Sequence, residues 1–104
     1  MSTTLPPVRV TLPYALQTLA HCDEEVTLTV DAPVTAQRVV AALEARFPQL
    51  SGAILEHGSG KRRPMIRFFA CQQDISHAPL TAALPAAVAD GREPFMIVGA
   101  IAGG

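Results

Sequence analysis

The sequence predicts a single α+β domain, in which one main helix packs on one face of a mixed four- or five-stranded sheet. Three observations favour this fold class: an alternating hairpin pattern near the start, one amphipathic helical segment in the middle, and short apolar runs that end in a buried strand. The chain has 104 residues, of which 49% are hydrophobic. That amount of apolar material fills one core and leaves none for a second domain.

The first third of the chain has the pattern of two strands. Apolar and polar residues alternate over residues 7–12 and again over residues 26–30, which is the period expected of half-buried strands. Between these segments, Leu16 and Leu19 suggest a short helical turn. We expect the two strands to pair.

One helix follows. Thr35 stands where it can cap the first turn, and Pro48 ends the helix. The side chains expected to face the core are Val39, Val40, Leu43 and Phe47. Residues 57–64 are polar and rich in glycine, and they are expected to form a surface loop before the next strand.

Residues 65–71 form a short apolar and aromatic run that predicts a strand. Phe68 and Phe69 are adjacent, so they point to opposite faces of the sheet. Arg67 shares the parity of Phe69, which places both on the uncovered face. There they are candidate partner-binding residues, although Phe69 is equally compatible with being an ordinary surface apolar residue or with lying under a second covering loop.

The last apolar run determines the domain boundary. Residues 94–98 do not alternate, so we expect a central strand buried on both faces. The alanine-rich segment 78–89 before it is expected to be a loop with a short strand or helical turn. The domain is therefore predicted to span residues 1–98, followed by a flexible tail at residues 99–104.

Composition excludes several function classes. Eight Lys and Arg residues oppose nine Asp and Glu residues, so no basic field exists for nucleic acid. The start of the sequence lacks the pattern of a signal peptide, and no apolar run is long enough to cross a membrane, so we expect a cytoplasmic protein. Cys22 and Cys71 are far apart and lack a neighbouring ligand pattern, which argues against a metal site.

The candidate chemistry lies in the tail. Six residues follow Val98 and reach roughly 20 Å when extended. Gly103 and Gly104 carry no side chain that would obstruct a narrow channel, so the Gly104 carboxylate can enter the active site of another protein. Adenylation supplies the leaving group that a carboxylate lacks, and sulfur can then displace the nucleotide to form a thiocarboxylate. Ile101 is expected to contact the partner.

The chain resembles the sulfur-carrier family of the molybdopterin synthase small subunit and the thiamine-pathway sulfur carrier. The resemblance rests on the first strand with Leu16 and Leu19, on the helix end at 43–50, and most specifically on Asp90-Gly91 through Gly103-Gly104. It implies a ubiquitin-like β-grasp fold, an adenylating partner of the ubiquitin-activating type that uses Mg-ATP, and a downstream sulfur-accepting enzyme.

By the same resemblance the protein is not an enzyme itself but a co-substrate, or the small subunit of a sulfurtransferase such as molybdopterin synthase, and it binds no cofactor stably. Residues 99–102 depart from the molybdopterin-type pattern, so molybdenum cofactor biosynthesis is one candidate pathway and the acceptor is left open. Two alternatives remain open as well. One is a ubiquitin-like modifier conjugated through Gly104, and the other is a β-grasp interaction module without transfer activity.

Overall fold

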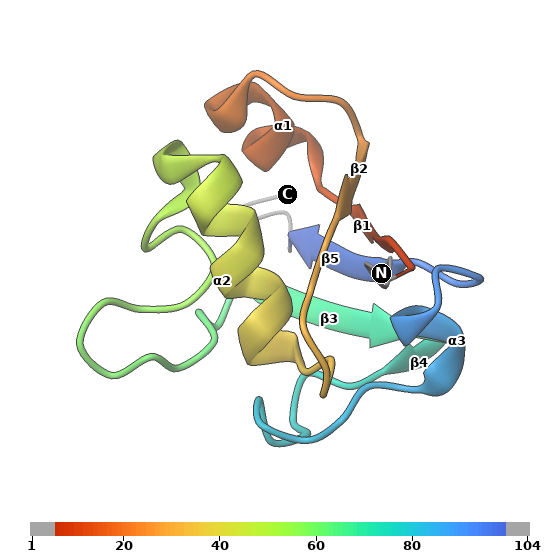
Figure 1. The fold of residues 1–104 in the computed structure, drawn as a ribbon. Coiled ribbons are helices and arrows are strands. Elements are labelled where there is room, and N and C mark those ends of the chain that lie inside the picture. Colours follow the sequence, from red (N-terminus) through yellow and green to blue (C-terminus); the bar gives the residue numbers. More distant parts are fainter. Residues whose placement is uncertain (1–5, 100–104) are drawn as a thin grey trace.

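The computed structural model describes residues 6–99, which form a five-stranded mixed sheet with one main helix across one face (Figure 1). The elements in chain order are β1 (Val8–Thr11), α1 (Tyr14–Ala20), β2 (Glu25–Leu28), α2 (Ala36–Arg46), the 3-10 turn η1 (Pro48–Leu50), β3 (Ile66–Ala70), β4 (Gln73–Asp74), α3 (Ala86–Ala89) and β5 (Phe95–Gly99). The predicted α+β class is confirmed.

The last strand is the middle of the sheet. The strand order is β2-β1-β5-β3-β4, so β5 lies between β1 and β3. It runs parallel to β1, with Val10 opposite Phe95, and antiparallel to β3, with Ile66 opposite Gly99. The central position predicted for the last apolar run is confirmed.

Helix α2 supplies one wall of the core. The Thr35 side chain accepts a hydrogen bond from the Arg38 backbone N–H at 3.1 Å, which caps the helix as its position in the sequence predicts. The helix residues Val39, Val40 and Leu43 are fully buried. They face inward-pointing strand residues of the same core, among them Val8, Val10, Phe68, Phe95 and Ile97. Phe47, also expected to face the core, is only partly buried against it at the helix end.

The prediction that β5 is buried on both faces is wrong. Its burial alternates: Phe95 and Ile97 are buried, whereas Met96 and Val98 are 38% and 36% exposed. The strand is central in the hydrogen-bonded direction only, because α2 covers one face of the sheet and no helix in residues 6–99 covers the other (Figure 1). The sequence of this strand does not alternate because the residues on its outer face are also apolar. It does not indicate a second covering layer.

Two elements are more regular than the sequence pattern indicated. The segment around Leu16 and Leu19 is a seven-residue helix, α1, in which Leu16 is buried and Leu19 is 46% exposed. The polar residues after β3 form the two-residue strand β4, which pairs with the end of β3. None of the helices in residues 6–99 is long and apolar enough to span a membrane.

Candidate functional site

Three of the predicted site residues, Ile101, Gly103 and Gly104, lie outside the residues that the structure describes. The structure does place the strand that leads to them. β5 ends at Gly99, which pairs with Ile66. A Cβ added to Gly99 would lie 3.5 Å from the Pro13 side chain, so the inner face of Gly99 is turned toward the start of α1.

The strand that precedes the tail is firmly anchored. Phe95 is fully buried, and its ring lies 5.1 Å from the ring of Phe68 between centroids. The turn before β5 is also fixed, because the Arg9 guanidinium donates hydrogen bonds of 3.2 Å to the carbonyl oxygens of Gly91 and Arg92. The tail therefore continues from a rigid central strand rather than from a loop.

The open face of the sheet carries an apolar group that we call the sheet patch, made of Phe69, Met96 and Val98. Phe69 lies opposite Met96 across the β3–β5 pairing. Phe69 and Arg67 are half-buried, whereas their strand neighbours Ile66, Phe68 and Ala70 are buried, so the alternation places both residues on the open face as expected. Their role in partner binding stays a prediction.

An ion pair borders the sheet patch on the β4 side. Arg67 lies opposite Val98 and holds the Asp74 carboxylate at 2.7 Å. Hydrogen bonds from Ser76, and then those from Arg67, lower the pKa of Asp74 to about 2. One of these bonds runs from the Ser76 backbone N–H to Asp74 Oδ1 at 2.8 Å. The charge of Arg67 is thus matched within the molecule.

A second ion pair lies on the other side. Arg9 donates to the Glu25 carboxylate at 3.0 Å, and this hydrogen bond lowers the pKa of Glu25 and raises that of Arg9. The sheet patch is therefore an apolar strip between two internally neutralised pairs. Such a surface suits an apolar partner surface better than a strongly charged one.

A groove lies beside the end of β5, and we call it the tail-base groove. It has a volume of about 490 Å³ and is lined by Pro13, Tyr14, Ala15, Leu16, Met65, Ile66 and Gly99. Tyr14 and Met65 on its rim are 80% and 45% exposed. Sequence reasoning missed this groove because it joins the start of α1, the start of β3 and the end of β5, three segments distant in sequence.

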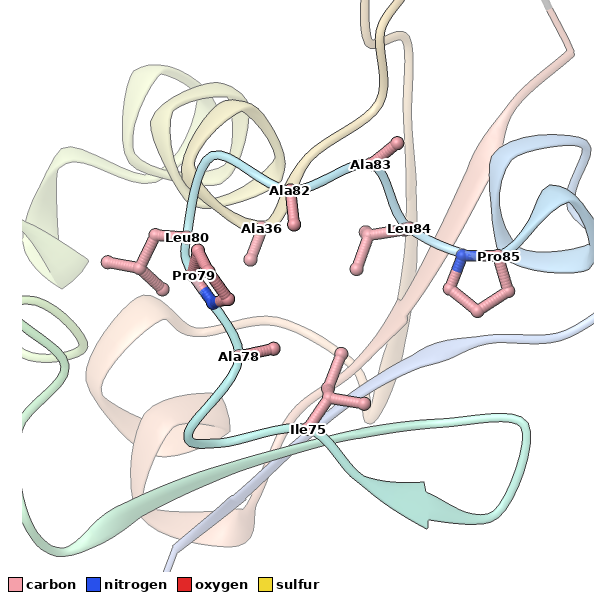
Figure 2. A pocket seen from close by; sticks show the side chains of 9 residues that line it. All are labelled: Ala36, Ile75, Ala78, Pro79, Leu80, Ala82, Ala83, Leu84 and Pro85. Carbon is pink, nitrogen blue, oxygen red and sulfur yellow. The ribbon is translucent and has the colours of Figure 1, made fainter.

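Two further hollows are lined mainly by apolar residues. The loop between β4 and α3 encloses a pocket of about 70 Å³ against Ala36, and every side chain that lines it is apolar (Figure 2). A shallower hollow of about 330 Å³ beside α3 has Asp90 as its one charged lining residue. Neither hollow holds the acid, base and nucleophile that a catalytic site requires.

Within residues 6–99, no three His, Cys, Asp or Glu side chains gather closely enough to hold a metal ion. Cys22 and Cys71 are both free thiols. Burial, followed by the nearby Asp23 carboxylate, raises the pKa of Cys22, which makes its reactive thiolate scarcer.

No protein-family model matches the sequence, and a search of curated proteins finds no match. Solved structures do match. SAMP1 from Haloferax volcanii is similar with a TM-score of 0.73 and 20% identity, covering 94% of this chain and 99% of the other. CysO from Mycobacterium tuberculosis has a TM-score of 0.71 and 23% identity, covering 90% and 99%.

A third structure shows CysO of Amycolatopsis orientalis in a complex with BexX. It has a TM-score of 0.70 and 19% identity, and the match covers 93% of this chain and 99% of the other. These matches extend over almost the whole length of both chains, so they compare complete folds rather than a shared fragment. On this basis, the protein has the ubiquitin-like β-grasp fold that it shares with small archaeal modifier proteins and with CysO.

Proposed function

We propose that this protein is a sulfur carrier whose Gly104 carboxylate is adenylated by a partner enzyme and converted to a thiocarboxylate. The proposal rests on two features taken together: the β-grasp fold and the two glycines that follow its last strand. The rigid central strand β5 ends at Gly99, and Gly103-Gly104 follow within five residues. The similarity of the fold to CysO and to small archaeal modifier proteins supports it.

The chemistry proceeds in two displacements. The Gly104 carboxylate oxygen attacks the α-phosphorus of ATP, and pyrophosphate leaves. Sulfide then attacks the carbonyl carbon, the bond from that carbon to the phosphate oxygen breaks, and AMP leaves with the electron pair. The product is a thiocarboxylate on the tail. Mg-ATP and the catalytic groups belong to the partner, so this protein acts as a co-substrate.

The fold supports this role by fixing the base of the tail. Phe95 and Ile97 anchor β5 in the core between two hydrogen-bonded neighbours. A fixed base restricts where the carboxylate can travel, which lowers the entropy lost when it enters an active site. The sheet patch then gives the adenylating enzyme a surface to bind, with Phe69 opposite Met96 and with Arg67 at the edge opposite Val98.

The experiment compares variants of the tail with the native chain. Intact-mass analysis of the protein from its source first establishes that Gly104 is the last residue. ATP-pyrophosphate exchange by the adenylating enzyme of the same organism is then measured for the native chain, for Gly103→Leu and for a chain lacking Gly104. A branched side chain obstructs a channel shaped for bare backbone, and the deletion withdraws the carboxylate by roughly 3.3 Å.

We expect both variants to lose exchange by about a hundredfold or more, because a misplacement near 1 Å can already cost about that much. Melting curves should stay close to that of the native chain. Ala102→Ser is the matched control, since it changes the tail without adding a branched side chain. Near-normal exchange by either tail variant would contradict the role proposed for Gly103 and Gly104. A native chain that supports no exchange would favour an interaction module without transfer.

A second candidate is conjugation of Gly104 to lysine side chains of other proteins. The name of one matched structure, small archaeal modifier protein 1, favours it. Both candidates begin with adenylation, so exchange does not separate them. Mass spectrometry of the protein recovered from cells does: an oxygen-to-sulfur exchange on Gly104 identifies the carrier, and isopeptide-linked peptides ending in Gly103-Gly104 identify the modifier.

A further inference from the structure

The proposed function uses the tail and the sheet patch but does not involve the tail-base groove. Its lining contains no charged side chain, and Tyr14 and Met65 on its rim are exposed to solvent. Tyrosine and methionine are enriched in protein interfaces relative to the rest of the surface. The groove therefore has the composition of a contact surface for an apolar side chain.

The walls of the groove are held in place. Backbone N–H groups of Leu16 and Gln17 donate to the Pro13 carbonyl oxygen at 3.0 Å, and the Gln17 side chain donates to the Leu12 carbonyl oxygen at 2.8 Å. On the opposite wall, the Arg62 guanidinium donates to the Ile66 carbonyl oxygen at 2.5 Å. These bonds fix the start of α1 and the start of β3, so a partner meets a largely preformed groove.

The five residues after Gly99 limit how far the adenylating site can lie from this groove. Five residues reach roughly 17 Å when extended. If Gly104 supplies the carboxylate, as in the proposed function on which this step rests, the adenylating site lies within that distance of Gly99. A domain of 200 residues has a radius of gyration of about 16 Å. An enzyme of that size cannot bring its interior so near to Gly99 without covering the surface around it.

We propose that the tail-base groove is a binding site for an apolar side chain of the adenylating enzyme, with Tyr14 and Met65 as the principal contacts. Val98 of the sheet patch directly precedes Gly99 of the groove. The partner's contact surface therefore continues from the open face around the end of β5. The groove holds the base of the tail against the entrance of the channel, and its loss affects binding of this protein rather than the chemical step.

The test measures KM for this protein and kcat separately in ATP-pyrophosphate exchange with the adenylating enzyme of the same organism. Tyr14→Ala and Met65→Ala should each raise KM at least about fivefold, as truncation of a central interface residue does. The kcat should not change, because the carboxylate reaches the same position once bound. Tyr14→Phe should behave like the native chain, since the contact is apolar.

Leu19→Ala is the matched control. Leu19 lies on the same helix and is 46% exposed, but it does not line the groove. Its KM should equal that of the native chain, and melting curves should show that all four variants are folded. Unchanged KM values for both Tyr14→Ala and Met65→Ala, with an active native chain, would overturn the inference and leave the proposed function standing.

Two further outcomes are also decisive. If the native chain supports no exchange, the proposed function fails and this inference fails with it. If the native chain forms a dimer in sedimentation that Tyr14→Ala dissociates, while KM stays unchanged, the groove binds a second copy and not the enzyme.

Discussion

At the scale of single residues, the turn before β5 depends on Gly91. Its φ is +84°, and a Cβ added there would lie 2.5 Å from the Pro7 carbonyl oxygen. Its own carbonyl accepts a hydrogen bond from Arg9. Position 91 therefore needs glycine for two separate reasons, the left-handed backbone and the close approach of another backbone segment.

We predict that Gly91→Ala lowers the free energy of unfolding by roughly 3 kcal/mol, because strain and a backbone clash add together. Gly58→Ala is the matched control. Its φ is +83°, but nothing lies within 4 Å of an added Cβ, so it should cost only about 1 kcal/mol. Denaturant unfolding measures both, and equal losses would show that the Pro7 segment moves aside without cost.

Asp74, at the border of the sheet patch, makes the stability of the fold depend on pH. Its pKa is about 2 in the folded protein, below the ordinary value of 3.8. A lowered folded pKa contributes stability that is present above the unfolded value and is lost as pH falls toward the folded value. We predict that Asp74→Asn reduces the loss of stability between about pH 4 and pH 2, measured by melting curves across that range.

Arg67→Met is the variant to compare with Asp74→Asn. It removes the smaller contribution and leaves the hydrogen bonds from Ser76, which are the larger cause of the shift. The pH dependence should therefore shrink less than in Asp74→Asn. Equal effects of the two changes would show that the ion pair, and not Ser76, controls Asp74.

At the scale of elements, the alternation of β3 places two adjacent phenylalanines in different surroundings. Phe68 is 1% exposed and packs against Phe95, whereas Phe69 is half-buried on the open face. Two adjacent residues of the same type thus differ in burial, and we predict that they differ in role. They form an internal comparison of a core ring with a surface ring.

We predict that Phe68→Ala lowers the free energy of unfolding by about 4 kcal/mol, as a large-to-small change in a core does. Phe69→Ala should cost about 1 kcal/mol or less and should instead raise KM in pyrophosphate exchange. Denaturant unfolding and exchange kinetics give the two readouts. A loss of several kcal/mol for Phe69→Ala would place that ring in the core and remove it from the sheet patch.

At the scale of the whole molecule, the two faces of the sheet differ in how they are covered. Helix α2 covers one face of the sheet and builds the core, while Met96 and Val98 on the other face are partly exposed (Figure 1). In the proposed function the reactive group is the Gly104 carboxylate, so neither thiol takes part. Cys22 is half-buried and Cys71 is exposed in the turn after β3.

We predict that the double variant Cys22→Ser, Cys71→Ser still accepts sulfur, because the sulfur is carried on the terminal carbonyl carbon. Intact-mass analysis after incubation with the adenylating enzyme, ATP and sulfide should show the same oxygen-to-sulfur exchange as the native chain. The melting curve confirms that the variant is folded. A folded double variant without exchange would mean that a cysteine carries the sulfur.

The sequence by itself determined the α+β class and the cap at Thr35, because these depend on local spacing and hydrophobic period. It also determined the side of β3 on which Phe69 lies, since alternation is a property of the backbone. The Gly103-Gly104 motif can be read directly from the sequence. None of these required knowledge of which segments meet.

The tertiary structure decided which faces are covered and which distant segments come together. An apolar run such as residues 94–98 reads the same whether one or both faces are buried, because sequence records the side chains and not the layer above them. Only the packing of α2 on one face shows that Met96 and Val98 stay exposed. The tail-base groove likewise arises where α1, β3 and β5 meet, and a contact between segments distant in sequence leaves no local pattern to read.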